Sequence, residues 1–462
     1  MSETILLPTP TVREQSRREP TRPGKSYFIR TFGCQMNAHD SERIAGQFEL
    51  DGMAPVDSFE AADVVYVNTC TIRENADNRM YGNLGQLKAI KDLNPEMLLV
   101  VGGCAAQKDR ELVRERAPWV DVVMGTHNLD RVLDLIDHAE HWGPITEVVD
   151  ELQAMPSSLP VRRELEHSAW VTIQVGCNNT CTFCIVPSVR GVEISRRPGD
   201  IVREVERLAA DGVVEVTLLG QNVDTYGRDL ALDGKRRPIF GELLRRVGAV
   251  DGIERVRFTS PHPNDFRVDV AEAMVETPAV CEQLHFPLQS GSDRILRAMH
   301  RGYNRKKYLG RLAMARETIP GLAVSTDIIV GFPGETDEDF EQTMEIVERA
   351  RFDAAFTFIF SPRPGTAAAK LVDQFVPDEV IKERFDRLVA VQDQISQEIN
   401  EQSVGSVLEV LSEGPSRKRP EVATTRTRTG KVVSVEGPHP SGAFLDARIT
   451  KAGHHSMIGS AV

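Results

Sequence analysis

Strongly apolar runs recur along the first part of the chain, and each is followed by a segment with helical spacing. The runs are SYFIRTFGC from residue 26, DVVYVNTC up to Cys70, MLLVVGGC up to Cys104, and VDVVMGTH over 120–127. Nearly continuous apolar strands that alternate with helices are typical of a parallel sheet covered on both faces. The pattern therefore predicts a doubly wound α/β domain over residues 25–150.

The same alternation resumes after a linker predicted at 151–167. Strand-like runs follow at 169–177, 215–223, 255–263, 283–291, 324–334 and 354–366, with amphipathic helical stretches between them. Regular βα units of this kind predict a barrel-like parallel sheet, which is incomplete because eight units are needed to close it. We expect a partial (β/α)6 barrel over residues 168–400.

The two ends of the chain differ from this pattern. Residues 401–462 contain short alternating runs rich in Val, Thr, Ser and Gly, which predict a small, OB-like β-barrel. Residues 1–24 mix Pro, Arg, Glu and Thr with little periodicity and are predicted to be a disordered lead-in. No apolar run of the length of a membrane helix and no secretion signal is found, so we expect a cytoplasmic protein without a membrane partner.

The net charge of the chain limits the kinds of partner that it can bind. The chain has 55 basic and 68 acidic residues, a net charge of −13, which argues against non-specific binding of polyanions. A nucleic-acid partner would need a local basic patch, and 401–462 is mildly basic. With Phe444 the only aromatic residue there, backbone contacts are favoured over base stacking. The residues predicted to contact RNA are Arg417, Lys418, Arg419, Arg426, Arg428 and Lys431.

Three of the seven cysteines, Cys177, Cys181 and Cys184, share one loop at the end of the first barrel strand. Active sites of such barrels lie at this end of the strands. Three thiolates without a nearby fourth ligand suit an iron–sulfur cluster with one open iron, because a structural zinc ion needs four ligands. A zinc site with a distant fourth ligand and a loop of buried thiols are the alternatives.

A second trio of cysteines, Cys34, Cys70 and Cys104, closes three predicted strands. The carboxyl ends of parallel strands lie along one edge of the sheet, so these cysteines can meet at one point. Each also precedes a helix N-terminus, which favours an anionic cluster. We predict a second metal cluster here, with three buried structural cysteines as the alternative. Cys281 is given no ligand role.

The segment VGCNNTCTFCIVPSVRG resembles the cluster loop of radical S-adenosylmethionine enzymes, with the aromatic Phe183 before the third cysteine. Together with TFGCQMNAHDSE, NTCTIRENA and VVGGCAAQ, it is similar to the methylthiotransferase family. The similarity is greatest to members that act on N6-isopentenyladenosine in tRNA. It extends over the chain after residue 24, includes a C-terminal barrel of the TRAM kind, and holds at all six cysteines.

The resemblance implies two [4Fe-4S] clusters and S-adenosylmethionine as cofactors. One S-adenosylmethionine methylates sulfur on the second cluster, and another yields a 5′-deoxyadenosyl radical at the open iron. The methylthio group then replaces the C2 hydrogen of the adenine at position 37. Implied partners are the tRNA anticodon loop, a low-potential electron donor such as flavodoxin or ferredoxin, and a sulfur donor. We expect a monomer with no catalytic side chains beyond the cluster ligands.

Several residues near strand ends are expected to contact the cofactor. For Phe183 the alternative is a core aromatic, and for Gln221 and Asn222 it is turn formation. Arg190 either neutralises a carboxylate or phosphate or lies on the surface. The complete predicted cofactor set is Phe183, Gln221, Asn222, Thr326, Asp327 and Gly331.

Other substrates and one other class of protein remain possible at this point. Within the family, the rivals act on threonylcarbamoyladenosine in tRNA or on an aspartate of a ribosomal protein. The GCQMNAHDSE segment favours the isopentenyladenosine members, and a protein substrate would not need a basic tail. An iron–sulfur electron carrier with an RNA-binding tail would not cleave S-adenosylmethionine, and it leaves the open iron unexplained. No Ser–His–Asp set or Walker loop supports a hydrolase or a nucleotide triphosphatase.

Overall fold

The computed structural model describes residues 19–71, 74–151, 159–231, 234 and 236–462. The chain forms two compact units: the first runs to Glu164 and includes 175–179 and 184–194, and the second contains 165–174, 180–183 and 195–462. The predicted linker at 151–167 lies partly outside the described residues. Within these residues no helix is both long and apolar enough to cross a membrane.

The first unit is built on a six-stranded parallel sheet in the order β2-β1-β3-β4-β5-β6. The four predicted strands are present. The edge strands β2 and β6 were not predicted, because runs of two or three residues leave no pattern. The strands are β1 (Ser26–Thr31), β2 (Ala54–Pro55), β3 (Val64–Thr69), β4 (Leu98–Gly103), β5 (Val122–Met124) and β6 (Ile145–Glu147).

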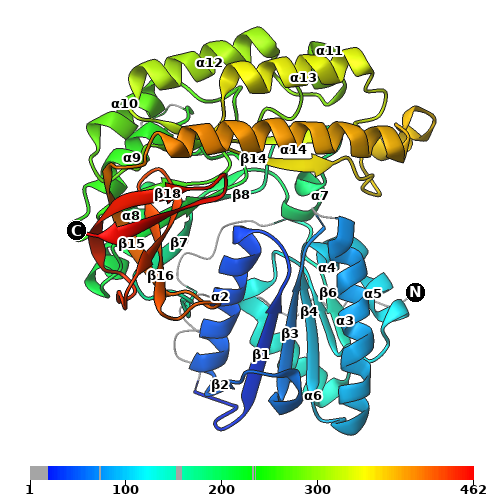
Figure 1. Cartoon of the computed structure of the whole chain (residues 1–462). Coiled ribbons are helices and arrows are strands. Elements are labelled where there is room, and N and C mark those ends of the chain that lie inside the picture. The colour runs from blue at the N-terminus through cyan, green and yellow to red at the C-terminus, as the bar shows by residue number, and fades with distance from the viewer. Residues whose placement is uncertain (1–18, 72–73, 152–158, 232–233, 235) are drawn as a thin grey trace. The chain divides into compact units, whose positions relative to one another are not determined.

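Helices cover both faces of this sheet, which confirms the doubly wound domain. Side chains of α2 and α6 pack with Tyr66 and Val100 on one face, and those of α3, α4 and α5 pack with Val65 and Val101 on the other (Figure 1). The strand order reverses at β1, so the crevice between β1 and β3 is the switch point where such sheets bind ligands. The helices are α2 (Gln35–Leu50), α3 (Glu74–Leu93), α4 (Cys104–Asp109), α5 (Glu111–Arg116), α6 (Val132–Trp142) and α7 (Val186–Arg190), with short 3-10 turns η1 (Phe59–Ala61) and η2 (Leu129–Arg131).

The predicted disordered lead-in is wrong for its last residues, whereas residues 1–18 lie outside the described part. The guanidinium of Arg22 is only 5% exposed and pairs with Asp51, Asp137 and Glu140 at 2.7, 2.6 and 2.5 Å. One buried arginine among three carboxylates anchors a segment that has no apolar pattern, and hydrophobic periodicity cannot reveal such an anchor.

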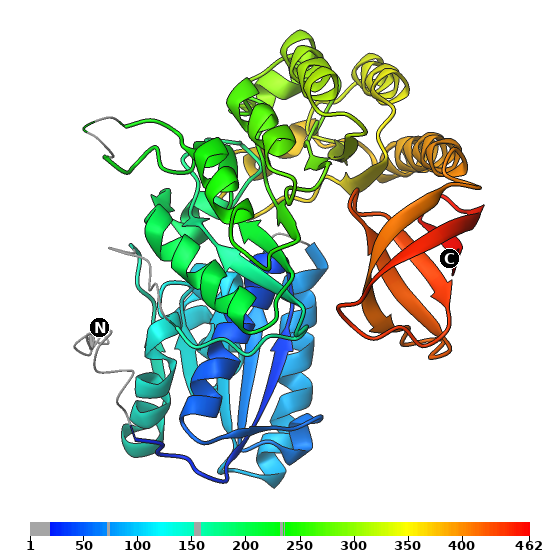
Figure 2. The same cartoon turned by 90° about the vertical axis from the view of Figure 1, so that its left-hand side faces the viewer.

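The second unit begins with six parallel strands that follow one another in chain order, as predicted. They form two sheets, β11-β10-β7 and β12-β13-β14, which a bridge between Val256 and Val280 connects. Helices cover the outer face and bury the main apolar core against the strands (Figure 2). The strands are β7 (Ser168–Thr172), β10 (Glu215–Leu219), β11 (Arg255–Phe258), β12 (Gln283–His285), β13 (Ala323–Val330) and β14 (Ala354–Ile359), and a small pair is formed by β8 (Gln174–Val175) and β9 (Ile194–Ser195). The helices are α8 (Pro198–Ala210), α9 (Phe240–Gly248), α10 (Val268–Glu276), α11 (Asp293–Ala298), α12 (Arg305–Thr318), α13 (Asp337–Ala350) and α14 (Asp378–Glu401), with 3-10 turns η3 (Val223–Thr225), η4 (Ala368–Lys370) and η5 (Val372–Gln374).

The C-terminal residues form the predicted small barrel (orange to red in Figure 2). Its five strands close in the order β15-β16-β17-β19-β18 around Val410, Val433, Ile449 and Met457. The strands are β15 (Val407–Pro415), β16 (Val422–Thr427), β17 (Val432–Glu436), β18 (Phe444–Ala452) and β19 (Ser456–Ala461).

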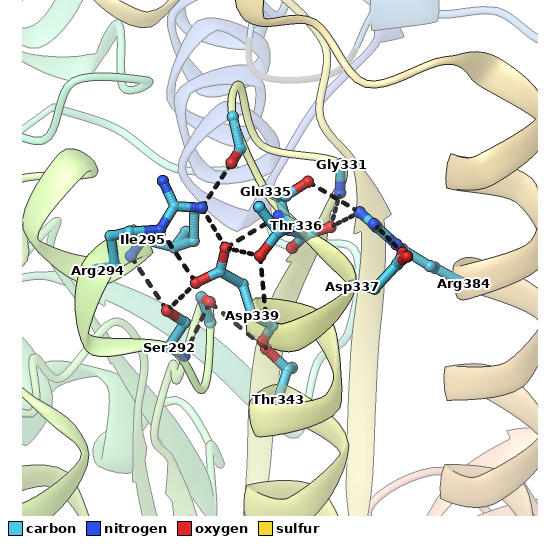
Figure 3. A network of polar contacts seen from close by, with 12 residues as sticks. Ser292, Arg294, Ile295, Gly331, Glu335, Thr336, Asp337, Asp339, Thr343 and Arg384 are labelled. Atoms are coloured by element: carbon cyan, nitrogen blue, oxygen red, sulfur yellow. Dashed lines mark hydrogen bonds and ion pairs between the residues drawn. The ribbon is translucent and has the colours of Figure 1, made fainter.

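A polar network fixes the loop after β13 to α14 (Figure 3). Arg384 of α14 pairs with Glu335 at 2.9 Å and with Asp337 at 2.6 Å, and the Arg384 and Glu335 side chains are 4% and 2% exposed. Thr336 and Asp339 form a capping box at the start of α13. The loop is thus held from both sides by hydrogen bonds, in addition to the apolar packing of Phe332.

We expect Arg384→Met to destabilise the attachment of α14 by about 3–5 kcal/mol, because Glu335 keeps its buried charge without its partner. Hydrogen exchange of the α14 amides measures this opening free energy. The control is Arg387→Met, which removes an exposed pair with Glu341 and should cost less than about 1 kcal/mol. Equal protection of α14 in both variants would show that the buried pair contributes nothing.

Candidate functional site

The fold brings the cysteines of the first unit to one edge of its sheet. Cys34 follows β1 and is the N-cap of α2, Cys70 directly follows β3, and Cys104 directly follows β4. A Cβ on Gly33 would lie 3.0 Å from the Cβ of Cys70. Burial raises the pKa of the Cys104 thiol to about 11, with further contributions from the Cys70 and Cys34 sulfurs. The three thiols therefore share one neighbourhood, at the β1/β3 switch point.

In the part of the chain that the structure describes, the thiols of neither trio lie as close together as the ligands of a single metal ion. Among the described residues, only Asp393, His454 and His455 offer three such ligand atoms within 4.8 Å of one another, so the thiols of both trios are spread more widely. A zinc ion holds its sulfur ligands at about 2.3 Å and thus within about 4 Å of one another. A cluster with several irons accepts wider spacing. No described cysteine is in a disulfide.

A network of buried hydrogen bonds shapes the loops around this trio. Asn37 donates to the Asn68 side chain at 2.9 Å, and Asn68 donates back to the Asn37 carbonyl at 2.8 Å. The Thr69 hydroxyl accepts from the Ala105 amide at 3.2 Å. A Cβ on Gly103, at φ 90°, would lie 2.4 Å from the Asn68 amide oxygen. Sequence reasoning missed these residues, although two polar residues at the end of the apolar strand VVYVNT were a usable signal.

The start of the Cys177–Cys184 loop is clamped within the first unit. The Cys177 amide donates to the Gly191 carbonyl at 3.1 Å, and Asn178 exchanges hydrogen bonds with Glu193. A Cβ on Gly176, at φ 78°, would lie 2.0 Å from the Val192 carbonyl oxygen, so only glycine permits this approach. The start of the loop is thereby closed on the segment 191–193 that follows α7.

The middle of the same loop is held within the second unit. The Arg301 guanidinium donates to the Cys181 sulfur at 3.3 Å. Burial alone would lower the pKa of Arg301, but Tyr303 and Cys181 raise it above its ordinary value. This hydrogen bond fixes the position of the Cys181 sulfur. Nothing in the sequence around Arg301 indicated this role.

Phe183 lies in a small apolar cluster with Ile295, Met299, Phe332 and Ala368. Its ring meets that of Phe332 edge-on, with the centroids 6.5 Å apart. The ring is half-buried, which gives it a packing role, and its predicted contact with an adenine stays a prediction.

Beyond β10, several buried polar atoms have no partner among the described residues. Asn222 donates to Asp265 at 2.9 Å, but its carbonyl oxygen and that of Gln221 have none. The same holds for one Asp224 carboxyl oxygen and for Nε2 of His262, whose amide donates to Asp224 at 2.7 Å. Burial raises the pKa of Asp224 to about 8 and lowers that of His262 to about 2. Buried polar atoms are normally bonded, so this set suits a polar ligand. Asp224 and His262 were not predicted.

The three predicted residues of β13 and its loop differ in their surroundings. The Thr326 hydroxyl donates to the Phe286 carbonyl and accepts from the Leu288 amide, both at 2.9 Å. A Cβ on Gly331 would lie 2.6 Å from Ile381, so this glycine permits α14 to pack closely. Thr326 thus fixes neighbouring backbone and Gly331 admits α14, and their predicted contact with the cofactor stays a prediction.

Asp327, the third of these residues, lies on an open sheet face that carries aromatic side chains. It pairs with Nε2 of His285 at 3.2 Å. The strand register places Phe356 beside Asp327 and Phe358 beside Ile329, and these two phenyl rings are 56% and 38% exposed. We call His285, Asp327, Phe356 and Phe358 the aromatic face. Alternate residues of β13 pack against the helices on the opposite side, so the aromatic face is the inner face of the barrel.

The six basic residues predicted to contact RNA fall into two groups. Arg428 donates to both carboxylate oxygens of Glu282, and Lys431 pairs with Asp353 at 2.9 Å, so both attach the C-terminal barrel to the central strands. Arg426 pairs with Glu413 at 2.7 Å. The other three, Arg417, Lys418 and Arg419, are exposed in the turn between β15 and β16.

Three family descriptions match successive parts of the chain. Residues 26–125 match the Uncharacterized protein family UPF0004, residues 171–347 the Radical SAM superfamily, and residues 401–462 the TRAM domain. Among solved structures, the radical S-adenosylmethionine methyltransferase TsrM from Kitasatospora setae is similar, with a TM-score of 0.53 at 13% identity over 84% of this chain and 78% of that one. At this identity the likeness concerns the fold alone.

Curated relatives are much more similar in sequence. Proteins named tRNA-2-methylthio-N(6)-dimethylallyladenosine synthase are 51% identical in Corynebacterium jeikeium, over 97% of this chain and 89% of the relative, and 53% identical in Mycobacterium bovis, over 95% and 87%. The relative from Saccharopolyspora erythraea is 52% identical over 94% of this chain and 89% of its own length. The two cysteine trios, the partial barrel and the C-terminal barrel thus occur in a chain that belongs to the family of radical SAM tRNA-2-methylthio-N(6)-dimethylallyladenosine synthases.

Proposed function

We propose that this protein transfers a methylthio group to C2 of N6-isopentenyladenosine at position 37 of tRNA. The observation that carries the proposal is 51% identity to a relative of that activity over 97% of the chain. The two separate cysteine trios support it, since the reaction needs both a radical source and a sulfur source. The isopentenyl group of the substrate is the dimethylallyl group in the relatives' name.

In this proposal Cys177, Cys181 and Cys184 hold the cluster that binds S-adenosylmethionine, and Cys34, Cys70 and Cys104 hold the second cluster. When bound, these groups supply the carbon radical and the sulfur, which no amino-acid side chain can provide. The protein's residues bind and orient them. Arg301 holds the Cys181 sulfur in place, and the hydrogen bonds between Asn37 and Asn68 fix the loops of the second trio.

The aromatic face is the proposed site of the modified base. Phe356 and Phe358 offer apolar surface for the adenine ring and the isopentenyl tail. A threonylcarbamoyl group carries a carboxylate instead, and the acidic Asp327 on this face disfavours it. Because the Asn264 amide donates to Nδ1 of His262, the proton of this neutral ring is on Nε2. That N–H and the protonated Asp224 suit acceptor atoms of a nucleoside, either of the substrate or of S-adenosylmethionine.

The tRNA would be held by the exposed turn with Arg417, Lys418 and Arg419. Position 37 lies in a single-stranded loop, so the base can enter the barrel without opening a duplex. We further propose that the reaction takes place in the cytoplasm, with a low-potential electron donor and a sulfur donor as protein partners.

The proposed ligand sets predict the iron content. Reconstituted protein should hold about eight irons per chain, and Cys34→Ala or Cys177→Ala should each leave about four. Anaerobic iron counting with electron paramagnetic resonance checks this. Loss of both clusters in either single variant would contradict two independent sites. The matched control is Cys281→Ala, which should keep all the iron.

Deletion of the gene should remove 2-methylthio-N6-isopentenyladenosine from cellular tRNA and leave N6-isopentenyladenosine in its place. Mass spectrometry of tRNA nucleosides measures both. The wild-type gene should restore the product, whereas genes encoding Cys34→Ala or Cys177→Ala should not. Persistence of the methylthio nucleoside after deletion would remove the substrate assignment.

Replacement of Phe356 or Phe358 by alanine should weaken binding of the base. Stacking on an aromatic ring is worth about 1–3 kcal/mol per base, so the KM for tRNA should rise ~5- to 150-fold. Cleavage of S-adenosylmethionine in the absence of tRNA should persist. Trp142→Ala, which removes a ring that is 75% exposed on the first unit, serves as control. An unchanged KM in both phenylalanine variants would place the base elsewhere.

A further inference from the structure

A buried ion pair links the end of the Cys177–Cys184 loop region to the second cysteine trio. Arg190, the last residue of α7, pairs with Asp40 of α2 at 2.8 Å, and the two side chains are 5% and 4% exposed. Both residues belong to the first unit. Of the two interpretations that the sequence left open for Arg190, the structure therefore supports neutralisation of a carboxylate, and a surface position is wrong.

The surroundings of this pair lead directly to the trio. Val189 and Ile185, on the same segment as Arg190, pack against Cys104. The Thr126 hydroxyl donates to the Val189 carbonyl at 2.6 Å and anchors the end of α7. Ile185 directly follows Cys184, so the segment that starts at a ligand of one trio ends in a cation beside the other.

The charge of Arg190 acts on the thiols themselves. Burial alone would lower the pKa of Arg190, but Asp40, Cys104 and Cys34 raise it above its ordinary value. His127 is buried near Arg190, and burial together with that cation lowers its pKa to about 4, so it is neutral at pH 7. The Tyr66 hydroxyl, also buried nearby, stays protonated because burial raises its pKa.

A purely structural role explains this arrangement poorly. A buried ion pair loses the hydration of both ions and seldom contributes more stability than apolar residues of similar volume. Asp40 neutralises Arg190 while the thiols are protonated. Once three thiolates hold an iron–sulfur cluster, the site becomes anionic, and reduction adds one more negative charge. The guanidinium of Arg190, one residue from Val189 that packs against Cys104, is a buried cation that would offset this added charge.

We propose that Arg190 stabilises the reduced form of the cluster on Cys34, Cys70 and Cys104 and thereby raises its reduction potential, with Asp40 as the residue that positions the guanidinium. This inference rests on the proposed function only in that this trio holds the second cluster. The potential of an iron–sulfur cluster depends on nearby charge and on hydrogen bonds to its sulfurs. Removal of a buried cation should therefore make the cluster harder to reduce.

The experiment uses the full-length chain with Cys177, Cys181 and Cys184 replaced by alanine, so that only the second cluster is present. After anaerobic reconstitution, the midpoint potential is measured by a redox titration monitored by electron paramagnetic resonance. In this background, Arg190→Gln should lower the potential. At a fixed applied potential the ratio of reduced to oxidised cluster should fall about tenfold or more, which is about 59 mV for one electron.

Two further variants test the direction of the shift in midpoint potential. They also test the proposal if Arg190→Gln does not retain its cluster. Asp40→Asn removes the compensating anion and should raise the potential. Arg190→Lys keeps the charge and should shift the potential less than Arg190→Gln. The control is Arg131→Gln, which breaks a pair with Glu147 that is equally buried in the same unit, and it should leave the potential unchanged.

An unchanged potential in Arg190→Gln with an intact cluster, or shifts of the same sign in Arg190→Gln and Asp40→Asn, would overturn the inference. Failure of the proposed cluster assignment has a different signature. In that case the triple-alanine background takes up no cluster, or it keeps its iron when Cys34 is also replaced by alanine.

Discussion

The site of the first unit depends on one property of parallel sheets: all strands end at the same edge. Cys34, Cys70 and Cys104 are separated by whole βα units, yet each lies within three residues of the carboxyl end of a strand, and β1, β3 and β4 are neighbours. The reversal of strand order at β1 opens a crevice there. These three thiols are brought together without any local motif, whereas Cys177, Cys181 and Cys184 need only one loop.

Assembly of these sites requires buried polar groups, and the fold satisfies them with fixed partners. Hydrogen bonds among Asn37, Asn68 and Thr69 hold the loops that carry Cys34, Cys70 and Cys104. Arg384 and Glu335 do the same for the loop after β13. Such groups are costly to bury unless each has its partner, and for that reason they hold their loops in one geometry. Rigid loops are what a metal cluster needs, because its ligands must keep their positions.

The role of each arginine in this protein depends on the groups around its guanidinium. Arg301 donates to a cysteine sulfur, and Arg190 faces both a carboxylate and two thiols. Arg428 attaches the C-terminal barrel by donating to Glu282 and to backbone carbonyls. In sequence these side chains are equivalent cations. Cys181, Asp40 and Glu282, which pair with Arg301, Arg190 and Arg428, each lie more than a hundred residues from their arginine, and only such partners separate a cluster residue from a docking residue.

The sequence by itself determined the order of elements, the doubly wound domain, the partial barrel, the small C-terminal barrel and the two cysteine trios, because apolar periodicity and cysteine spacing are local signals. The contacts of each polar residue, by contrast, depend on the tertiary structure. In the folded chain Thr326 bonds to the Phe286 carbonyl, and Gly331 admits Ile381 of α14. Arg428 and Lys431 pair with Glu282 and Asp353 and so attach the C-terminal barrel. Phe356 and Phe358 remain exposed beside Asp327. The tertiary structure also anchored Arg22 in a segment without any pattern. The physical reason is that a strand's period tells which side chains share a face, whereas the surroundings of a charge or an aromatic ring depend on distant elements that pack against it.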